Sequence, residues 1–147
     1  MNQAMIKPIE ILLVEDNEGD VFLTRRAFEK AKLANNIEVA ADGEIAMDML
    51  RRQGEYSTLS KPDIVLLDIN LPKKDGKQVL KEMKEDEELR RIPVVILTSS
   101  QAEQDVIKSY DEHASSYIVK PINLEKFRDV VTAIEDFWFS VVVLPKE

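Results

Sequence analysis

The sequence predicts one α/β domain of the (βα)₅ type, with a doubly wound, five-stranded parallel sheet in the strand order 2-1-3-4-5. Short apolar runs alternate along the chain with longer segments whose apolar residues recur at helical spacing. These runs are apolar throughout, as is typical of strands that helices cover on both faces. A length of 147 residues suits a single domain with a substantial core.

The elements follow one another in a regular order. Strand candidates occupy residues 9–14, 37–40, 64–67, 94–97 and 117–119. The intervening helices are expected at about 19–32, from Ile45 to near Gly54, around Val79–Met83 and at 101–112, and a last helix begins near Asn123, a good N-cap. With no linker or repeat between them, we expect one domain over residues 1–147, with a core at about 8–136 and an apolar extension at 137–147.

Composition excludes several classes of protein. The chain has 28 acidic and 20 basic residues, a net charge of −8, and no concentrated basic face, so direct nucleic-acid binding is not expected. It has no cysteine, which removes disulfides and thiol chemistry. No apolar run reaches the length of a membrane span, and the start lacks the pattern of a signal peptide. We therefore expect a cytoplasmic protein with no membrane contact.

The only histidine is His113, which lies in a polar segment without a nucleophile motif nearby. A histidine-based catalytic triad would depend on this one residue. We interpret His113 as a surface residue.

Chemically active side chains follow four of the five predicted strands. In an open α/β sheet, ligands bind beyond the carboxyl ends of the strands, so residues in these positions converge on one edge. The residues concerned are Glu15 and Asp16 after the first strand, Asp68 after the third, Thr98 and Ser99 after the fourth, and Lys120 after the fifth.

Three carboxylates at one edge repel one another, by about 4 kcal/mol for a pair 4 Å apart at an effective dielectric constant near 20. A bound cation relieves this repulsion, and a few carboxylates with water suit Mg²⁺ (or Mn²⁺). Three carboxylates, one Mg²⁺ and one lysine ammonium have a total charge of zero. The pattern therefore predicts a metal site in which Glu15 and Asp16 form the metal-binding pair.

Asp68 is then the favoured acceptor of a phosphoryl group, because it stands alone at the end of a central strand. Aspartate can form a covalent acyl phosphate. Phosphoryl transfer needs mainly positioning and charge neutralisation, which Mg²⁺ and Lys120 would supply. The hydroxyl group of Thr98 could contact an incoming phosphoryl oxygen.

Each residue also has a simpler explanation. Asp16 or Asn17 could cap the first helix, and Thr98 with the two following serines could cap the fourth. Lys120 could be an exposed loop lysine. Together, at the ends of four strands, these residues favour the functional interpretation.

The motifs resemble the receiver domains of two-component response regulators, which have a flavodoxin-like fold, over essentially the full length. The matching segments are Ile11–Asn17, Asp63–Pro72, Asp75–Gly76, Val95–Ser99 and Tyr117–Pro121. The resemblance implies that Asp68 accepts phosphate from a sensor histidine kinase. It also implies that Glu15, Asp16, Asp68 and the backbone carbonyl of Asn70 surround Mg²⁺. Lys120 would pair with the acyl phosphate, ahead of a cis peptide bond at Pro121.

The same resemblance implies a switch. Thr98 would move toward the phosphoryl oxygen, and Tyr117 would turn inward and change the surface of the last helices and strand. Tyr117 could equally be an ordinary aromatic residue on a strand.

A narrower resemblance is to the single-domain regulators associated with bacterial and cyanobacterial phytochromes. It rests on Glu18–Asp20, Asn70–Gly76 and the ending Glu135–Pro145. A phytochrome is thus a candidate kinase partner.

The C-terminal tail has more apolar surface than one helix face can bury. Phe137, Phe139, Val142 and Val143 form a possible surface for homodimerisation or docking. Alternatively, the tail packs on its own domain.

Two other functions remain open. One is an aspartyl-phosphate phosphatase of the haloacid dehalogenase type. Those enzymes have an Asp-x-Asp pattern, but here Asn70 stands in the place of the second acid. The other is a receiver fold that only binds partners without phosphorylation, which the complete set of site residues argues against. We expect a signalling phosphoprotein that takes part in its own phosphorylation and dephosphorylation.

Overall fold

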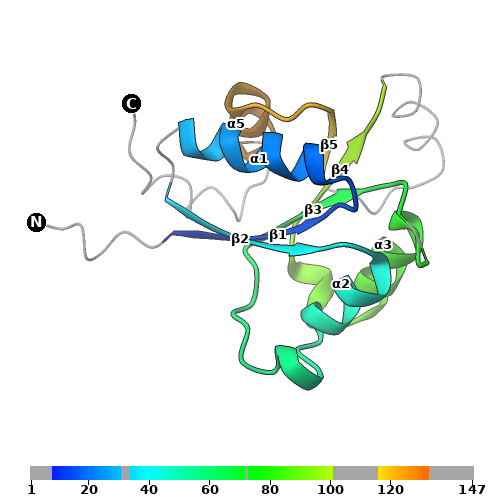
Figure 1. Cartoon of the computed structure of the whole chain (residues 1–147). Coiled ribbons are helices and arrows are strands. Elements are labelled where there is room, and N and C mark those ends of the chain that lie inside the picture. Colours follow the sequence, from blue (N-terminus) through cyan, green and yellow to red (C-terminus); the bar gives the residue numbers. More distant parts are fainter. Residues whose placement is uncertain (1–7, 31–33, 72, 101–115, 133–147) are drawn as a thin grey trace, which may run out of the picture.

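The computed structural model describes residues 8–30, 34–71, 73–100 and 116–132, and these form a sheet between two layers of helices (Figure 1). The strands are β1 (Ile9–Val14), β2 (Asn35–Ala40), β3 (Ile64–Asp68), β4 (Val94–Thr98) and β5 (Ser116–Val119). The α-helices are α1 (Glu18–Lys30), α2 (Gly43–Leu50), α3 (Gly76–Glu85) and α5 (Leu124–Thr132), with 3₁₀ turns at Gly54–Tyr56 and Leu89–Arg91.

All strand pairs in the sheet are parallel, and their order is β2-β1-β3-β4-β5, which confirms the predicted topology. The register brings the carboxyl ends together, because Val14 lies opposite both Ala40 and Leu67. In the same way Asp68 lies opposite Leu97, and Thr98 lies opposite Val119. The residues that follow β1, β3, β4 and β5 therefore meet at one edge.

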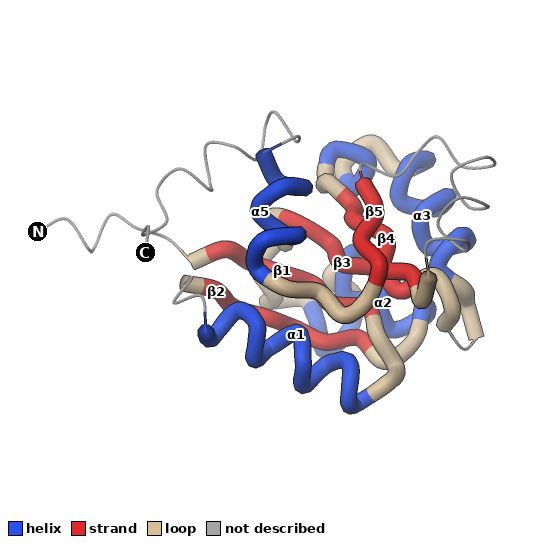
Figure 2. Tube along the Cα trace, turned by 90° about the horizontal axis from the view of Figure 1, so that it is seen from above, coloured by secondary structure: helices blue, strands red, loops and turns tan. Residues whose placement is uncertain are grey.

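Each face of the sheet carries its own hydrophobic core. Alternate strand residues such as Leu12, Val65 and Ile96 pack with α2 and α3, while their neighbours pack with α1 and α5. Figure 1 shows α2 and α3 below the sheet and α1 and α5 above it, and Figure 2 shows α1 and α5 from above. Burial on both faces explains the continuous apolar strands.

Side-chain caps fix where the helices begin. The Oδ1 of Asn17 accepts a hydrogen bond from the Asp20 N–H at 2.8 Å, and Asp42 caps α2 through the Ile45 N–H at 2.8 Å. Asn123 caps α5 through the Lys126 N–H at 2.8 Å, as predicted. Asn17 is thus a helix cap, which was one of the two candidates for this role.

The predicted elements agree with the structure apart from their ends. β2 begins at Asn35, two residues before the predicted start, and residues 31–33 at the end of the first predicted helix lie outside the described residues. The predicted helix at 101–112, His113 and the tail from 133 onward also lie outside them. Within the part of the chain that the structure describes, no helix is long and apolar enough to cross a membrane.

Candidate functional site

The site lies where β1, β3, β4 and β5 end. The Glu15 N–H donates to the Ala40 carbonyl at 3.0 Å, which extends the β1–β2 pairing by one residue and fixes the backbone of Glu15. The Lys120 N–H donates to the Thr98 carbonyl at 2.8 Å and fixes the lysine beside β4. The four predicted strand ends are thus brought together by backbone pairing.

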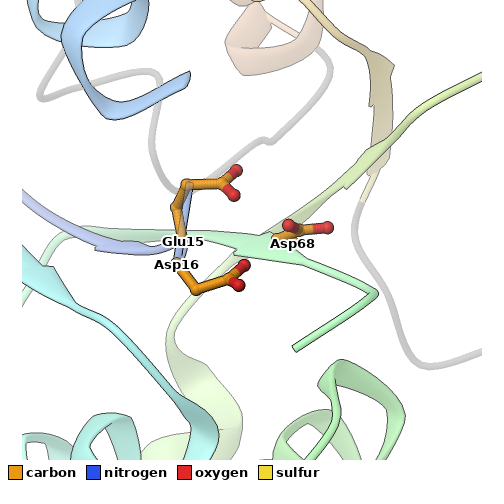
Figure 3. A group of neighbouring side chains, drawn as sticks. All are labelled: Glu15, Asp16 and Asp68. Atoms are coloured by element: carbon orange, nitrogen blue, oxygen red, sulfur yellow. The ribbon is translucent and has the colours of Figure 1, made fainter. Parts of the chain in front are cut away.

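Glu15, Asp16 and Asp68 form a carboxylate cluster (Figure 3). One oxygen from each of the three side chains lies within 4.8 Å of the others. Glu15 and Asp68 are 2% and 4% exposed, whereas Asp16 is exposed to solvent. A set of carboxylate oxygens with one side open to water is the donor set that Mg²⁺ prefers, and the residues present fit this ion.

Lys120 makes an ion pair with three carboxylates. Its Nζ lies 2.8 Å from Asp20 Oδ2, 3.0 Å from Glu15 Oε1 and 3.3 Å from Asp68 Oδ2. Its side chain is only 17% exposed. Lys120 is therefore part of the site and not an exposed loop lysine.

The charges at the site shift the pKa values of its buried groups. Burial is the main cause that raises the pKa of Glu15 to about 7; Asp68 raises it further, and Lys120 lowers it. Burial by itself lowers the pKa of Lys120, but the hydrogen bonds to Asp20 and Glu15 and the charges of Asp68 and Glu15 outweigh this effect and raise it above its usual value. The lysine stays charged, and the carboxylates are held together against their repulsion.

The loop after β3 positions the Asp68 carboxylate. The Asn70 N–H donates to Asp68 Oδ1 at 3.1 Å, and the Gly76 N–H donates to the Ile69 carbonyl at 3.1 Å. A Cβ atom at Gly76 would lie 2.6 Å from the Asp68 carbonyl oxygen, closer than real contacts allow. Glycine at this position lets α3 begin directly against the end of β3. The role of the Asn70 carbonyl as a metal ligand remains a prediction.

Thr98 and Tyr117, the predicted switch residues, lie on neighbouring strands. Thr98 is fully buried, and its Oγ1 donates to the Ser100 carbonyl at 3.3 Å. Tyr117 is half-buried and packs against the core on the α2–α3 face. Their movement on phosphorylation remains a prediction.

Sequence reasoning missed Asp20 as a partner of Lys120. Asp20 lies in the first turn of α1, six residues beyond the end of β1, so a search of the residues directly after each strand passed over it. A signal was present, because a helix that begins at the edge of the sheet keeps its first turn near that edge. With Asp20 included, the charge balance of zero changes to −1 with Mg²⁺ bound.

Residues 11–132 match the model of the response regulator receiver domain, and the chain belongs to this family. It is 44% identical over 145 residues to response regulator Rcp1 of a Synechocystis strain. The match covers 99% of this chain and 99% of Rcp1. The resemblance to receiver domains is confirmed, and the chain is a signalling protein of the two-component type.

Solved structures agree with this assignment. The bacteriophytochrome response regulator AtBRR matches with a TM-score of 0.84 and 44% identity, covering 90% of this chain and 96% of its own. The phosphorylated cyanobacterial phytochrome response regulator RcpA matches with a TM-score of 0.73 and 45% identity, covering 95% of this chain and 100% of its own. The Mn²⁺-bound form of Rcp1 matches with a TM-score of 0.72 and 44% identity, covering 94% and 99%. Together with the carboxylate cluster, the last structure confirms the prediction of a divalent cation.

The Lys120–Pro121 peptide bond is cis in the structure, as the family resemblance implied.

Proposed function

We propose that Asp68 accepts a phosphoryl group from the phosphohistidine of a sensor histidine kinase. The observation that carries this proposal is the Lys120 ammonium group, which lies 3.3 Å from Asp68 Oδ2, beside a carboxylate cluster able to hold Mg²⁺. In this arrangement a nucleophilic oxygen, a fixed cation and a metal site share one edge of the sheet.

The reaction needs little more than positioning. An Asp68 carboxylate oxygen attacks phosphorus, the P–N bond of the phosphohistidine breaks, and the imidazole leaves with the electron pair and takes up a proton. Glu15, Asp16, Asp68 and the Asn70 carbonyl would hold Mg²⁺, which would supply positive charge to neutralise the phosphoryl oxygens. Lys120 donates to the same oxygens and lowers their repulsion from the carboxylates.

The proposal is tested with acetyl phosphate as the donor. The protein is incubated with Mg²⁺ and analysed by intact mass for an adduct that is stable in acid and labile in base. We expect one adduct in the native chain and in Asp48→Asn, an exposed control on α2, and none in Asp68→Asn or when EDTA replaces Mg²⁺. An adduct that survives in Asp68→Asn would refute the assignment.

We propose that the kinase docks beside Lys120, in an open groove between α1 and the loop that follows β5. Its floor is apolar, with Leu23, Pro121 and Ile122, and its rim carries Arg26 and Lys30. Because Pro121 directly follows Lys120, a helix in this groove places its histidine next to the phosphate-accepting edge. The occupant we propose is the histidine-bearing helix of the kinase, with apolar residues on its face and acids at its flank.

Exposure of α1 supports this choice of surface. Phe22 and Leu23 are 59% and 47% exposed, and they are the large hydrophobic residues that the described part of the chain leaves open to solvent. Leu23→Asp should slow phosphoryl transfer from an autophosphorylated cyanobacterial phytochrome kinase at least tenfold, while labelling by acetyl phosphate stays unchanged. Equal slowing with both donors would mean that the groove is not the kinase site.

The similarity to the bacteriophytochrome response regulator AtBRR and the cyanobacterial phytochrome response regulator RcpA supports a phytochrome as the kinase. We also propose that the protein is cytoplasmic and helps to hydrolyse its own phosphoryl group. Phosphorylation would then favour a second packing of Thr98 and Tyr117, which changes the surface near β5 and α5.

The tail provides the proposed output. Phe137, Phe139, Val142 and Val143 are the residues that we expect at a homodimer contact, and they lie outside the described residues. Sedimentation of a chain truncated after Glu135, with circular dichroism as the control for folding, tests this contact. We expect the full chain to sediment as a dimer and the truncated chain as a monomer. An unchanged oligomeric state would remove the proposal.

A further inference from the structure

Asp20 holds the shortest of the three ion pairs to Lys120, at 2.8 Å, although it lies on a helix and not at a strand end. Its backbone N–H is fixed by Asn17 Oδ1 at 2.8 Å, and its side chain is 32% exposed. The helix cap therefore fixes the backbone of Asp20, and the Asp20 carboxylate contacts the lysine from the first turn of α1. The same lysine connects the helix and the phosphate-accepting strand.

Asp20 differs from the other acids around Lys120 in having no place in the metal cluster, which consists of Glu15, Asp16 and Asp68. A lysine ammonium has three N–H donors, and in the resting site three carboxylates accept all of them. The carboxylates that would hold a metal ion, and whose charge it would neutralise, do not include Asp20. Lys120 is thus the direct charge partner of Asp20 at this edge.

A phosphoryl group on Asp68 changes this balance. The oxygens of Asp20 and Asp68 that contact Lys120 are at most about 6 Å apart, the sum of the two N–O distances. New negative charge at Asp68 is therefore repelled by Asp20 within a Debye length, and its oxygens must compete with Asp20 for the N–H groups of Lys120. A metal cation in the cluster experiences the opposite effect, because the Asp20 charge attracts it.

We propose that Asp20 is a positioning residue that holds Lys120 in the resting state and sets the balance between the unphosphorylated and phosphorylated forms. It favours binding of the cation and opposes gain of the phosphoryl anion. This proposal rests on the proposed function of Asp68 and adds a regulating residue to the same site. Its sign is specific, since loss of the Asp20 charge must change the affinities for metal and for phosphoryl group in opposite directions.

The test compares Asp20→Asn with the native chain by two equilibrium titrations. The first measures Mg²⁺ affinity by calorimetry, and the second measures affinity for beryllofluoride, a phosphoryl analogue, at saturating Mg²⁺. We expect Mg²⁺ to bind about three- to fivefold more weakly and beryllofluoride about three- to fivefold more tightly, the range of one partly exposed charge pair. Both changes should shrink at high ionic strength.

Glu18→Gln is the matched control, because Glu18 is an exposed acid in the same turn and is not among the three partners of Lys120. It should change each affinity less than Asp20→Asn does. Weaker binding of both ligands in Asp20→Asn would show a purely structural role, and unchanged binding of either, or equal effects in Glu18→Gln, would also overturn the proposal. Acetyl phosphate labelling of the native chain tests the proposed function of Asp68 separately from the role of Asp20. If the native chain is labelled but the affinities of Asp20→Asn are unaltered, only the role of Asp20 is refuted. If the native chain is not labelled, the proposed function is refuted as well.

Discussion

Replacement of Asp68 by asparagine should stabilise the metal-free protein, although it removes the phosphate-accepting oxygen. Asp68 and Glu15 are both buried, and their cluster oxygens lie within 4.8 Å, a distance at which two unit charges repel by about 3 kcal/mol at an effective dielectric constant near 20. The variant also loses the 3.3 Å ion pair between Asp68 and Lys120. Lys120 still keeps Glu15 and Asp20 as ion-pair partners, so this loss offsets only part of the gain. The net gain in the free energy of unfolding should be about 1–2 kcal/mol.

The same repulsion makes stability depend on pH. Burial and Asp68 raise the pKa of Glu15 from 4.5 to about 7 in the metal-free fold. Between these values the unfolded chain releases a proton that the folded chain keeps, so the stability that is present below pH 4.5 is lost as the pH rises toward 7. Because Asp68 is one cause of the shift, this loss should be smaller in Asp68→Asn.

Urea unfolding followed by circular dichroism, in EDTA at pH 5 and pH 8, measures both effects. Asp48→Asn makes the same chemical change at an exposed position and should alter stability by no more than about 0.5 kcal/mol. Added Mg²⁺ should stabilise the native chain more than Asp68→Asn, because at a given concentration a ligand that binds more tightly stabilises the fold more. The reasoning is wrong if Asp68→Asn is less stable than the native chain in EDTA at pH 8.

Three further predictions concern the framework, and urea unfolding measures each. Gly43→Ala should cost more than about 2 kcal/mol, because its Cβ would overlap the Lys74 carbonyl oxygen; an unchanged midpoint would contradict the close packing of the start of α2 on the loop at Lys74. Phe127→Ala should cost about 3–5 kcal/mol, because Phe127 is 2% exposed and packs edge-to-face on Phe28 at 4.8 Å; a cost below about 1 kcal/mol would contradict its place in the core. Hydrogen bonding from Lys74 lowers the pKa of Glu82 below 4.5, so Glu82 adds stability above that pH and loses it as the pH falls through the lowered value. Glu82→Gln should therefore cost up to about 1 kcal/mol at pH 7 and progressively less as the pH falls below 4.5, and a cost that does not depend on pH would exclude the ion pair as its cause.

The strand order and the central strands could be predicted because burial on both faces leaves a clear apolar signal. β2 was less clear, because it lies at the edge of the sheet and its residues alternate between half-buried and exposed up to the buried Ala40. Its polar start, Asn35 and Asn36, pairs through the backbone with Ile9 and Glu10, and backbone pairing leaves no trace in side-chain type. The 3₁₀ turns at Gly54–Tyr56 and Leu89–Arg91 were likewise not predicted, since single turns have no periodicity.

The site was predictable where topology alone brings residues together. Glu15, Asp16, Asp68 and Lys120 each follow a strand, so the parallel sheet dictates their convergence. Asp20 depends in addition on how the first turn of α1 is capped, and three-dimensional packing decides this. Its contact with Lys120 therefore came from the structure.

The central claim is that Asp68 carries the phosphoryl group, and chemical trapping tests it most directly. Borohydride reduces an acyl phosphate to an alcohol and releases phosphate, so a phosphorylated aspartate becomes homoserine, which peptide mass mapping locates. After treatment of the full chain with acetyl phosphate and Mg²⁺, we expect homoserine at position 68 and at no other aspartate. Homoserine at position 16 or 20 instead, or at none of the aspartates in a chain whose intact mass shows the adduct, would contradict the assignment.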